Sequence, residues 1–410
     1  MNKQLWFILV GACAFCLPGA FAQDAVFSPE MSLAEHEQSF LDGLNAEPDD
    51  DSARFALGAA QFLRSVELLG QAWYHYGLAS EIGREFGIPL LRLPVGANPN
   101  PTEVSYADVR TVLADFQGQL ALAEATLADV KGDPGVVLNL PDIYLDYNLN
   151  GAEDEGESLA TLAGIVNRVA ARDAASSAQP EEALELRLDQ GDAHWLRGYS
   201  HLLMALTDII LAHDSQELFS YTAQLFFPRA DVADDILYQR RNLVDLDDGE
   251  WVDVLTLVHL SLKVPLLEPE RMESALEHAR AVTEQSDLMW QAILTETDDD
   301  CEWIPNPAQT PVVGQPVTQE MVDAWLLFVE ETAALWRGER LIPHWRFPEG
   351  TGVNLPEVFN KPQDFDLILL IQGATLAPYV EEGEVISLAT LRQIQRVFSG
   401  EFIGFALWFN

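Results

Sequence analysis

The stretch SARFALGAAQFLRSVELLGQAWYHYGL (residues 52–78) decides the fold class, because its apolar side chains recur in steps of three and four residues. The stripe consists of Phe55, Ala59, Phe62, Val66, Leu69, Trp73 and Tyr76. A helix with one apolar face must bury that face against another element. The pattern therefore predicts a long amphipathic helix inside a helical domain, with Ser52 as its N-cap.

Similar patterns, separated by proline and glycine, continue along the chain. They predict helices at 106–130, 159–171, 181–188, 192–213, 250–262, 270–294 and 318–336, with 214–229 continuing the helix at 192–213. Residues 136–145, which include Pro141, are expected to be extended. We therefore expect a mainly α fold, a large helical domain of antiparallel helix hairpins, with a solenoid-like arrangement as one option. The segment 193–213 loosely resembles a tetratricopeptide repeat, although no 34-residue period is present.

The N-terminus has the features of a secretory signal. Lys3 precedes an apolar run at 5–17, and Ala20-Phe21-Ala22 offers a small-x-small cleavage site. A lipoprotein signal with Cys13 as the lipidated residue is the rival reading. We expect residues 1–22 to be removed and the protein to be exported, to the periplasm or the extracellular space.

The rest of the chain divides by composition. Residues 23–50 are expected to be a partly ordered acidic leader, and residues 51–300 a helical domain. A proline-rich linker or loop at 301–317 leads to a mixed helical region at 318–410, packed on the main domain. No later stretch is apolar for long enough to span a membrane.

The charge balance is strongly acidic, with 65 Asp and Glu against 23 Lys and Arg and a net charge of −42. Such a surface repels phosphate backbones and anionic lipid, so nucleic acid is not an expected partner. It attracts cations instead. Cys301 is the one cysteine outside the expected signal, so no internal disulfide is expected.

The most specific motif is the twelve-residue stretch DYNLNGAEDEGE (residues 146–157). It satisfies the pattern D-x-[DN]-x-[DN]-G-x5-E at every defined position. Calcium is a hard cation that takes six to eight oxygen ligands, and alternate acidic and amide side chains on a curling chain can supply them. Gly151 stands where the turn is sharpest.

This loop resembles the EF-hand family, over these twelve residues only. The resemblance implies a calcium (Ca²⁺) site with six ligand positions: Asp146, Asn148, Asn150, the backbone carbonyl of Ala152, Asp154 and Glu157. Two departures matter. Position eight is Glu153 rather than an aliphatic, and no second loop is present to pair with this one.

Three other groups of residues are more simply explained by a structural role than by a functional one. His194 and His201 lie seven residues apart and Asp208 extends the same face, which admits a metal or acid–base site but fits an ordinary packed helix better. Asp298-Asp299-Asp300 with Glu302 is more simply a solvated acidic loop than a second cation site. Four tryptophans are more simply interpreted as core residues than as the lining of a ligand groove: Trp303, Trp325, Trp336 and Trp345.

These observations predict an exported calcium-binding helical protein, in which calcium is mainly structural and the protein acts as a scaffold or interaction protein. A protein partner is part of that expectation, without an identity. The alternative is a secreted or periplasmic hydrolase with an acidic or aromatic cleft. The sequence contains no G-x-S-x-G, no H-E-x-x-H, no phosphate loop and no dinucleotide fingerprint.

Overall fold

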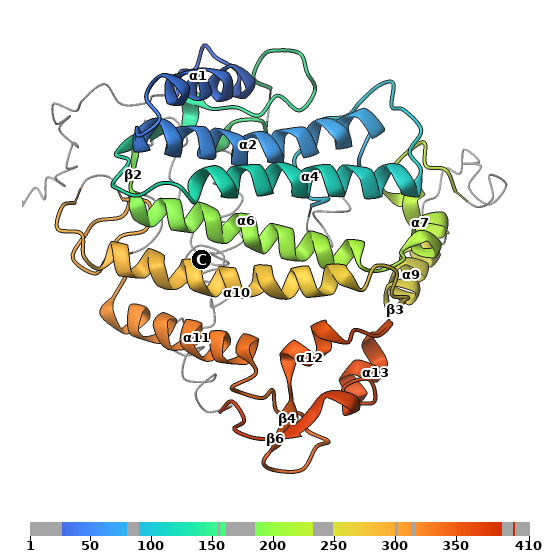
Figure 1. Cartoon of the computed structure of the whole chain (residues 1–410). Coiled ribbons are helices and arrows are strands. Elements are labelled where there is room, and N and C mark those ends of the chain that lie inside the picture. The colour runs from blue at the N-terminus through green and yellow to red at the C-terminus, as the bar shows by residue number, and fades with distance from the viewer. Residues whose placement is uncertain are drawn as a thin grey trace, which may run out of the picture.

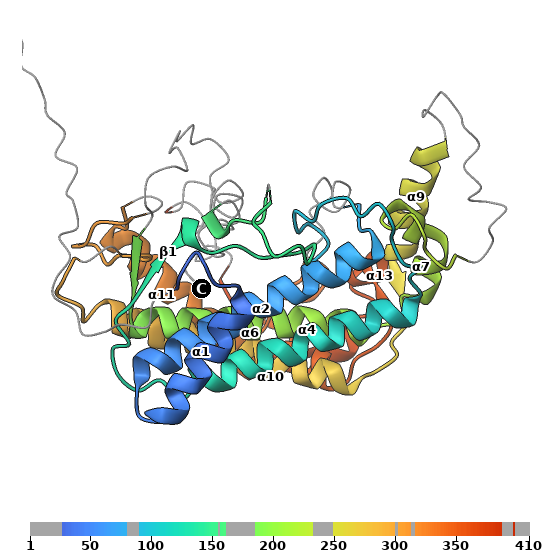
Figure 2. The same ribbon diagram turned by 90° about the horizontal axis from the view of Figure 1, so that it is seen from above.

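Long helices lie side by side in one layer of the computed structural model, which describes residues 27–79, 90–154, 156–160, 185–232, 249–299, 302–312, 316–387 and 397 (Figure 1). In spatial order they are α1 (Leu33–Ala46), α2 (Asp51–Tyr76), α4 (Tyr106–Leu127), α6 (Gln190–Leu211), α10 (Glu270–Ile293) and α11 (Gln319–Arg337). Each helix packs against the next in this series. The segment around β1 (Val136–Asn139) lies on one face of the layer (Figure 2).

Neighbouring helices run antiparallel, as the side-chain contacts between them show. Gln61 near the middle of α2 accepts a hydrogen bond from Thr126 at the end of α4, at 2.7 Å. Likewise, Glu124 late in α4 pairs with Arg197 early in α6, at 2.9 Å. The predicted mainly α fold of antiparallel helix hairpins is therefore confirmed.

Local sequence explains where the helices begin. Ser105 and Asp108 form a capping box at α4, as Asp189 and Asp192 do at α6. The N-cap of α2 is Asp50, whose side chain accepts hydrogen bonds from the backbone N–H groups of residues 52 and 53. The prediction of Ser52 as the cap is thus wrong by two residues, and its hydroxyl instead donates to the carbonyl oxygen of Pro134.

The apolar stripes meet in two clusters of buried side chains. The larger one surrounds α2, where Phe55 and Trp73 are fully buried. The smaller one joins α10 to α11, with Trp290 and Trp325 as its largest members. Burial of these aromatic side chains supplies much of the packing between the helices.

Short antiparallel strand pairs connect segments that are far apart in the sequence. β1 pairs with β2 (Glu185–Leu188), with Val136 opposite Leu188. The predicted helix at 181–188 is therefore wrong for residues 185–188. Side chains alternate there between exposed or half-buried Glu185 and Arg187 and buried Leu186 and Leu188, which is the pattern of a strand.

The remaining elements surround the ends of the helical layer. They are α7 (Gln216–Thr222), α9 (Gly249–Ser261), β3 (Lys263–Val264), β4 (Thr351–Val353), α12 (Leu355–Asn360), β5 (Phe365–Asp366), α13 (Leu367–Gln372) and β6 (Val380–Glu382). β3 pairs with β5 and β4 with β6, both antiparallel. Short 3-10 turns lie at Leu140–Asp142, Ala223–Leu225 and Ala377–Tyr379.

The predicted acidic leader at 23–50 contains an ordered helix. Ser32 and Glu35 form a capping box at the start of α1, and Leu33 and Phe40 are buried against α2. The acidic composition of this segment concealed an apolar face of only a few residues, because its other positions are solvated.

The expected signal at 1–22 and most of the expected helix at 159–171 lie outside the described residues. Among the helices described, none has a long enough apolar stretch to cross a bilayer.

Candidate calcium loop and a buried acidic cluster

The two ends of the loop at 146–157 are hydrogen-bonded to each other. Tyr144 and Ser158 form an antiparallel bridge. The N–H of Leu145 donates to the carbonyl of Glu157 at 2.9 Å, and the N–H of Leu159 donates to that of Ile143 at 2.8 Å. The loop is therefore closed by a short stretch of antiparallel backbone pairing. The prediction of an extended segment at 136–145 is confirmed for β1 and for the bridge at Tyr144, and is wrong for the 3-10 turn at Leu140–Asp142.

The first residues of the loop are anchored to α2. Asp146 donates its backbone N–H to Glu67 Oε1 at 2.9 Å, and its carbonyl accepts from Gln71 Nε2 at 2.8 Å. The ring of Tyr147 lies over Gly70 so closely that a Cβ there would be 2.1 Å from Tyr147 Cδ1. Because Tyr147 is only 1 % exposed, this end of the loop is part of the core.

Inside the turn, side-chain oxygens take up the backbone N–H groups. The two oxygens of Asp146 accept from the N–H groups of Asn150 and Gly151, at 3.0 and 2.9 Å. Asn148 Oδ1 accepts from the N–H of Asn150 at 3.0 Å, and Asn150 Oδ1 from that of Ala152 at 2.7 Å. Gly151 has φ of 75°, a conformation that favours glycine.

The later acids reach back toward the same turn. Asp154 Oδ2 accepts from the amide groups of Asn148 and Asn150, at 2.5 and 2.6 Å. Glu157 is 4 % exposed, and its two oxygens accept from the N–H groups of Tyr147 and Asp154, both at 2.9 Å. An oxygen that accepts one hydrogen bond keeps a second lone pair for a cation.

The structure thus brings together most of the predicted ligand side chains. Asn148, Asn150 and Asp154 contact one another, and Asp146 and Glu157 bond the backbone of the same turn. Ala152 is exposed. The donor set is oxygen-rich, as calcium requires. The carboxylates of residues 146, 154 and 157 do not lie within 4.8 Å of one another as a group, so the ligand set depends on the amides as well.

Burial affects the charges beside the loop. It is the main reason why the pKa of Glu157 is raised, and the backbone hydrogen bonds to its oxygens oppose that effect. Burial also raises the pKa of Glu67, whose ion pair with Arg64 acts in the other direction. A cation beside Glu157 would favour its ionised form.

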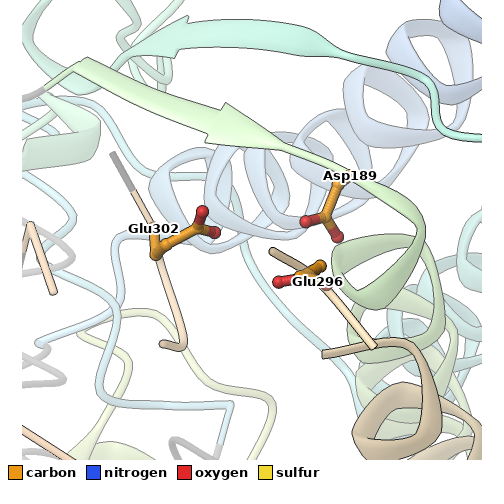
Figure 3. A group of neighbouring side chains, drawn as sticks. All are labelled: Asp189, Glu296 and Glu302. Carbon is orange, nitrogen blue, oxygen red and sulfur yellow. The ribbon is translucent and has the colours of Figure 1, made fainter. Parts of the chain in front are cut away.

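A second group of acids lies where β2 meets α6. It consists of Asp189, Glu296 and Glu302, which each have a carboxylate oxygen within 4.8 Å of those of the other two (Figure 3). Among the described residues, this is the group of acidic, histidine or cysteine side chains close enough together to hold a metal ion. Burial and the charge of Asp189 raise the pKa of Glu296 to about 8. The neighbouring Asp192 is buried as well, and its pKa is also raised.

This cluster could hold a cation or share protons, and its contacts favour shared protons. Asp189 caps α6 through the N–H groups of Gly191 and Asp192. Glu296 and Glu302 accept from Gln309 Nε2, at 3.2 and 3.1 Å. Carboxylates this close to each other cannot all be ionised at low cost, so protonation satisfies them without a metal.

The acidic stretch 298–302 separates into distinct roles. Asp298 pairs with Arg187 at 3.6 Å, and Asp299 accepts from the N–H of Thr310 at 2.6 Å. Glu302 is 5 % exposed and belongs to the buried cluster, while 300 and 301 lie outside the described residues. The interpretation as a solvated loop is therefore wrong for Glu302.

The histidine face of α6 packs against α10. His194 Nδ1 lies 2.8 Å from Gln285, and His201 Nδ1 lies 3.0 Å from His278 Nδ1. The expected packed helix is therefore present, and His278 is a partner that the sequence did not reveal. Of the tryptophans considered for a groove, Trp325 is in the core and Trp345 is 71 % exposed.

Several residues that shape these sites were not predicted from the sequence. Glu67 and Gln71 hold the loop from a helix some 75 residues earlier, and Asp189 joins Glu296 only through the fold. One signal existed for Glu67, an acid that directly follows Val66 of the apolar stripe in the predicted helix.

Comparison with protein-family models, with curated proteins and with solved structures found no match to this chain. The resemblance to the EF-hand family therefore rests on the sequence of the twelve loop residues alone.

Proposed function

We propose that this protein is a calcium-stabilised helical protein, in which the loop at 146–157 binds Ca²⁺ and the ion is structural. The proposal rests on one observation. The acidic and amide side chains of the loop turn toward one short segment, and that segment is fixed to α2 through Glu67 and Gln71. An ion held there connects the β1 region to the longest helix of the layer.

The charge of the chain supports a stabilising role for the ion. The protein has a net charge of −42, and the loop itself contains Glu153, Asp154, Glu155 and Glu157 in close succession. A divalent cation offsets this local repulsion and satisfies oxygens that are otherwise partly desolvated. Sites of this type outside cells bind with dissociation constants of roughly 10⁻⁴–10⁻³ M, which is sufficient where calcium is abundant.

The proposal includes export and a role as a scaffold or interaction protein. The apolar run and cleavage pattern at 1–22 support export, and the layer of antiparallel helices offers extended faces for a partner. N-terminal sequencing of the protein secreted by its host tests the first part, since cleavage after Ala22 leaves Gln23 as the first residue.

Isothermal calorimetry with calcium chloride tests the site itself. The wild type is expected to bind one ion. Glu157→Gln removes the charge of the terminal ligand but keeps its shape, so its affinity is expected to fall at least tenfold. Glu153→Gln is the matched control, because it removes one exposed charge from the same loop at a position that the resemblance does not assign to a ligand. Equal affinity of Glu157→Gln and wild type, or no heat with either, would overturn the proposal.

A further inference from the structure

α4, α6 and α10 pack in a common seven-residue register, and we call the polar contacts along it the ladder. Between α4 and α6, Arg110 donates to the carbonyl of Leu211, Gln117 donates to the carbonyl of Met204, and Arg197 donates to the carboxylate of Glu124. Between α6 and α10 they are His194 with Gln285, His201 with His278 and Asp208 with Arg271. A spacing of seven residues keeps side chains on one face over two turns, so each contact repeats along the interface.

The tautomers of the two histidines in the middle of this ladder depend on Glu124 and on each other. Glu124 accepts two hydrogen bonds from Arg197 and lies 3.5 Å from His201 Nε2. These contacts, with that to His201 the largest, lower the pKa of Glu124 to about 2, so it is ionised and requires the proton on His201 Nε2. When His201 is neutral, its Nδ1 is an acceptor, and His278 donates from Nδ1 across the 3.0 Å contact.

A lone pair therefore remains on His278 Nε2, and it faces a buried carboxylate. Asp208 is 1 % exposed, and its Oδ1 accepts from Arg271 at 2.9 Å. Its Oδ2 has no hydrogen-bond partner within the part of the chain that the structure describes, and lies 3.9 Å from His278 Nε2. Two acceptors thus face each other with no donor between them, which is costly at a buried position.

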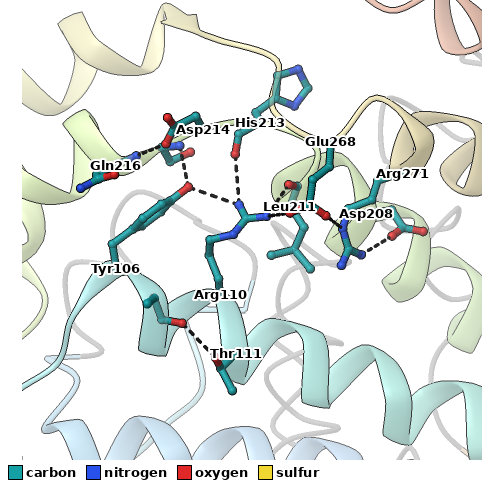
Figure 4. Close-up of polar contacts among 12 residues, drawn as sticks. Tyr106, Arg110, Thr111, Asp208, Leu211, His213, Asp214, Gln216, Glu268 and Arg271 are labelled. Atoms are coloured by element: carbon teal, nitrogen blue, oxygen red, sulfur yellow. Dashed lines mark hydrogen bonds and ion pairs between the residues drawn. The ribbon is translucent and has the colours of Figure 1, made fainter.

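Ion pairs hold Asp208 in this position. Arg271 also bonds Glu268 Oε2 at 2.5 Å, and Glu268 Oε1 bonds Arg110 of α4 (Figure 4). The Nε and one terminal nitrogen of Arg271 are shared by Asp208 Oδ1, Glu268 and Gln117, and Arg271 makes no hydrogen bond to Asp208 Oδ2.

Asp208 and His278 both line an open cavity of about 500 Å³ above α6, between α4 and α10. The α4 wall carries only small side chains at Ala114, Gly118 and Ala121, and Met204 forms part of the floor. A Cβ added at Gly118 would meet no atom within 4 Å, so the space beside it is free. The cavity thus has an apolar wall beside a buried carboxylate and a half-buried imidazole.

We propose that this cavity binds a primary aliphatic ammonium ion, whose N–H groups donate to Asp208 Oδ2 and His278 Nε2 while its alkyl chain lies along Ala114, Gly118 and Ala121. A nitrogen can lie at ordinary hydrogen-bond distance from two acceptors 3.9 Å apart. Because Asp208 Oδ2 is covered in this structure, binding includes a shift of the side chains around it. The strongly negative charge of the chain attracts such a cation.

The geometry favours an ammonium ion over a metal. A zinc ion about 2.0–2.1 Å from both atoms would lie almost on the line between them, far from the tetrahedral arrangement that zinc prefers. Calcium prefers oxygen ligands and gains little from an imidazole nitrogen. An ammonium ion supplies the missing donors without either constraint.

Titration with n-butylammonium chloride tests this inference, with the side-chain nitrogen resonances of the histidines as the readout. The full-length wild type is expected to bind saturably and to shift the His278 Nε2 signal. Butyltrimethylammonium has the same charge but no N–H group, and is expected to bind at least tenfold more weakly. Both probes should be used at constant ionic strength, because generic charge attraction is screened by salt.

Variants complete the experiment. Asp208→Asn and Gly118→Leu are each expected to weaken n-butylammonium binding at least tenfold, the first by removing the acceptor charge and the second by filling the cavity. Gly118 is exposed, so its variant tests the site even where Asp208→Asn fails to fold. Glu277→Gln, which removes an exposed charge next to His278, is the control that should bind as the wild type does.

The inference is overturned by any of three results: no saturable shift with the wild type, equal binding of the two probes, or unchanged binding by Gly118→Leu. Tight zinc binding that moves the same His278 signal would also overturn it, since it would show that Asp208 and His278 form a metal site. These results are independent of calcium binding at 146–157.

Discussion

The loop at 146–157 and the polar ladder between α6 and α10 both gather charged groups, but they do so in opposite ways. The loop acids lie within twelve residues of the sequence, and Glu153 and Asp154 are exposed. The ladder residues are far apart in the sequence and are buried or half-buried, with Asp208 at 1 % exposure. A site of the first kind can be recognised from spacing alone. A site of the second kind exists only once two helices have adopted one register.

The largest effect is expected from breaking the ladder at its buried end. Arg271→Met removes the partner of Asp208 Oδ1 and leaves a buried carboxylate without its cation. We expect a loss of about 3–5 kcal/mol in the free energy of unfolding. Urea denaturation measures it.

Arg337→Met is the matched control, because Arg337 and Glu339 form an ion pair that is about half exposed on both sides. Such pairs contribute about 0–1 kcal/mol. Equal losses in the two variants would mean that the ladder is no more than a surface feature.

The next effect concerns buried acids that are close in space but distant in sequence. The pKa of Glu296, raised to about 8, lies above its unfolded value, so ionisation destabilises the folded protein as the pH rises from about 4.5 to about 8. Glu296→Gln removes that cost. Because Glu296 is half-buried and its charge is screened by solvent, we expect this variant to be more stable than the wild type by about 2 kcal/mol at pH 9, less than the full shift would give.

The gain from Glu296→Gln should disappear below about pH 4.5, where the wild-type side chain is protonated in both states. Denaturation curves across this pH range check it. A constant difference at all pH values would exclude ionisation as its cause.

A smaller effect is expected from a substitution at the contact between α2 and the loop. Gly70→Ala places a Cβ 2.1 Å from the ring of Tyr147 and forces that residue to move. We expect a loss of about 1–3 kcal/mol from overpacking, together with weaker calcium binding. Thermal melts and calorimetry measure the two quantities.

Gly118→Ala is the control for this change, because it lies within α4 and a Cβ there meets no atom within 4 Å. Alanine in an open helical position stabilises by about 0.5–1 kcal/mol relative to glycine. Should Gly70→Ala bind calcium as the wild type does, the loop would be independent of α2.

The smallest effect is expected at a helix cap. Ser105→Ala removes the hydroxyl that accepts from the N–H of Asp108 at 3.2 Å and donates to its carboxylate at 2.7 Å. Loss of such a cap costs about 1 kcal/mol. It should leave calcium affinity unchanged, because α4 does not contribute ligands to the loop. A change in affinity would point to coupling that runs through the helical layer.

The sequence predicted the long helices well, because a stripe such as the one from Phe55 to Tyr76 repeats over many turns. It failed at 185–188, where four residues are too few to separate a strand from a helix, and at α1, whose apolar face is short. The loop turn was predicted because Gly151 and its neighbours act locally. Glu67, Asp189 and His278 were not, since their partners are brought to them only by tertiary packing.

Thermal unfolding of the wild type and of Glu157→Gln, in chelator and in 10 mM calcium chloride, tests the central claim most directly. With a dissociation constant of about 10⁻⁴ M, calcium at this concentration contributes about 2.7 kcal/mol to the free energy of unfolding. We predict that calcium raises the Tm of the wild type by several degrees and leaves that of Glu157→Gln almost unchanged. An identical wild-type Tm with and without calcium would contradict the account.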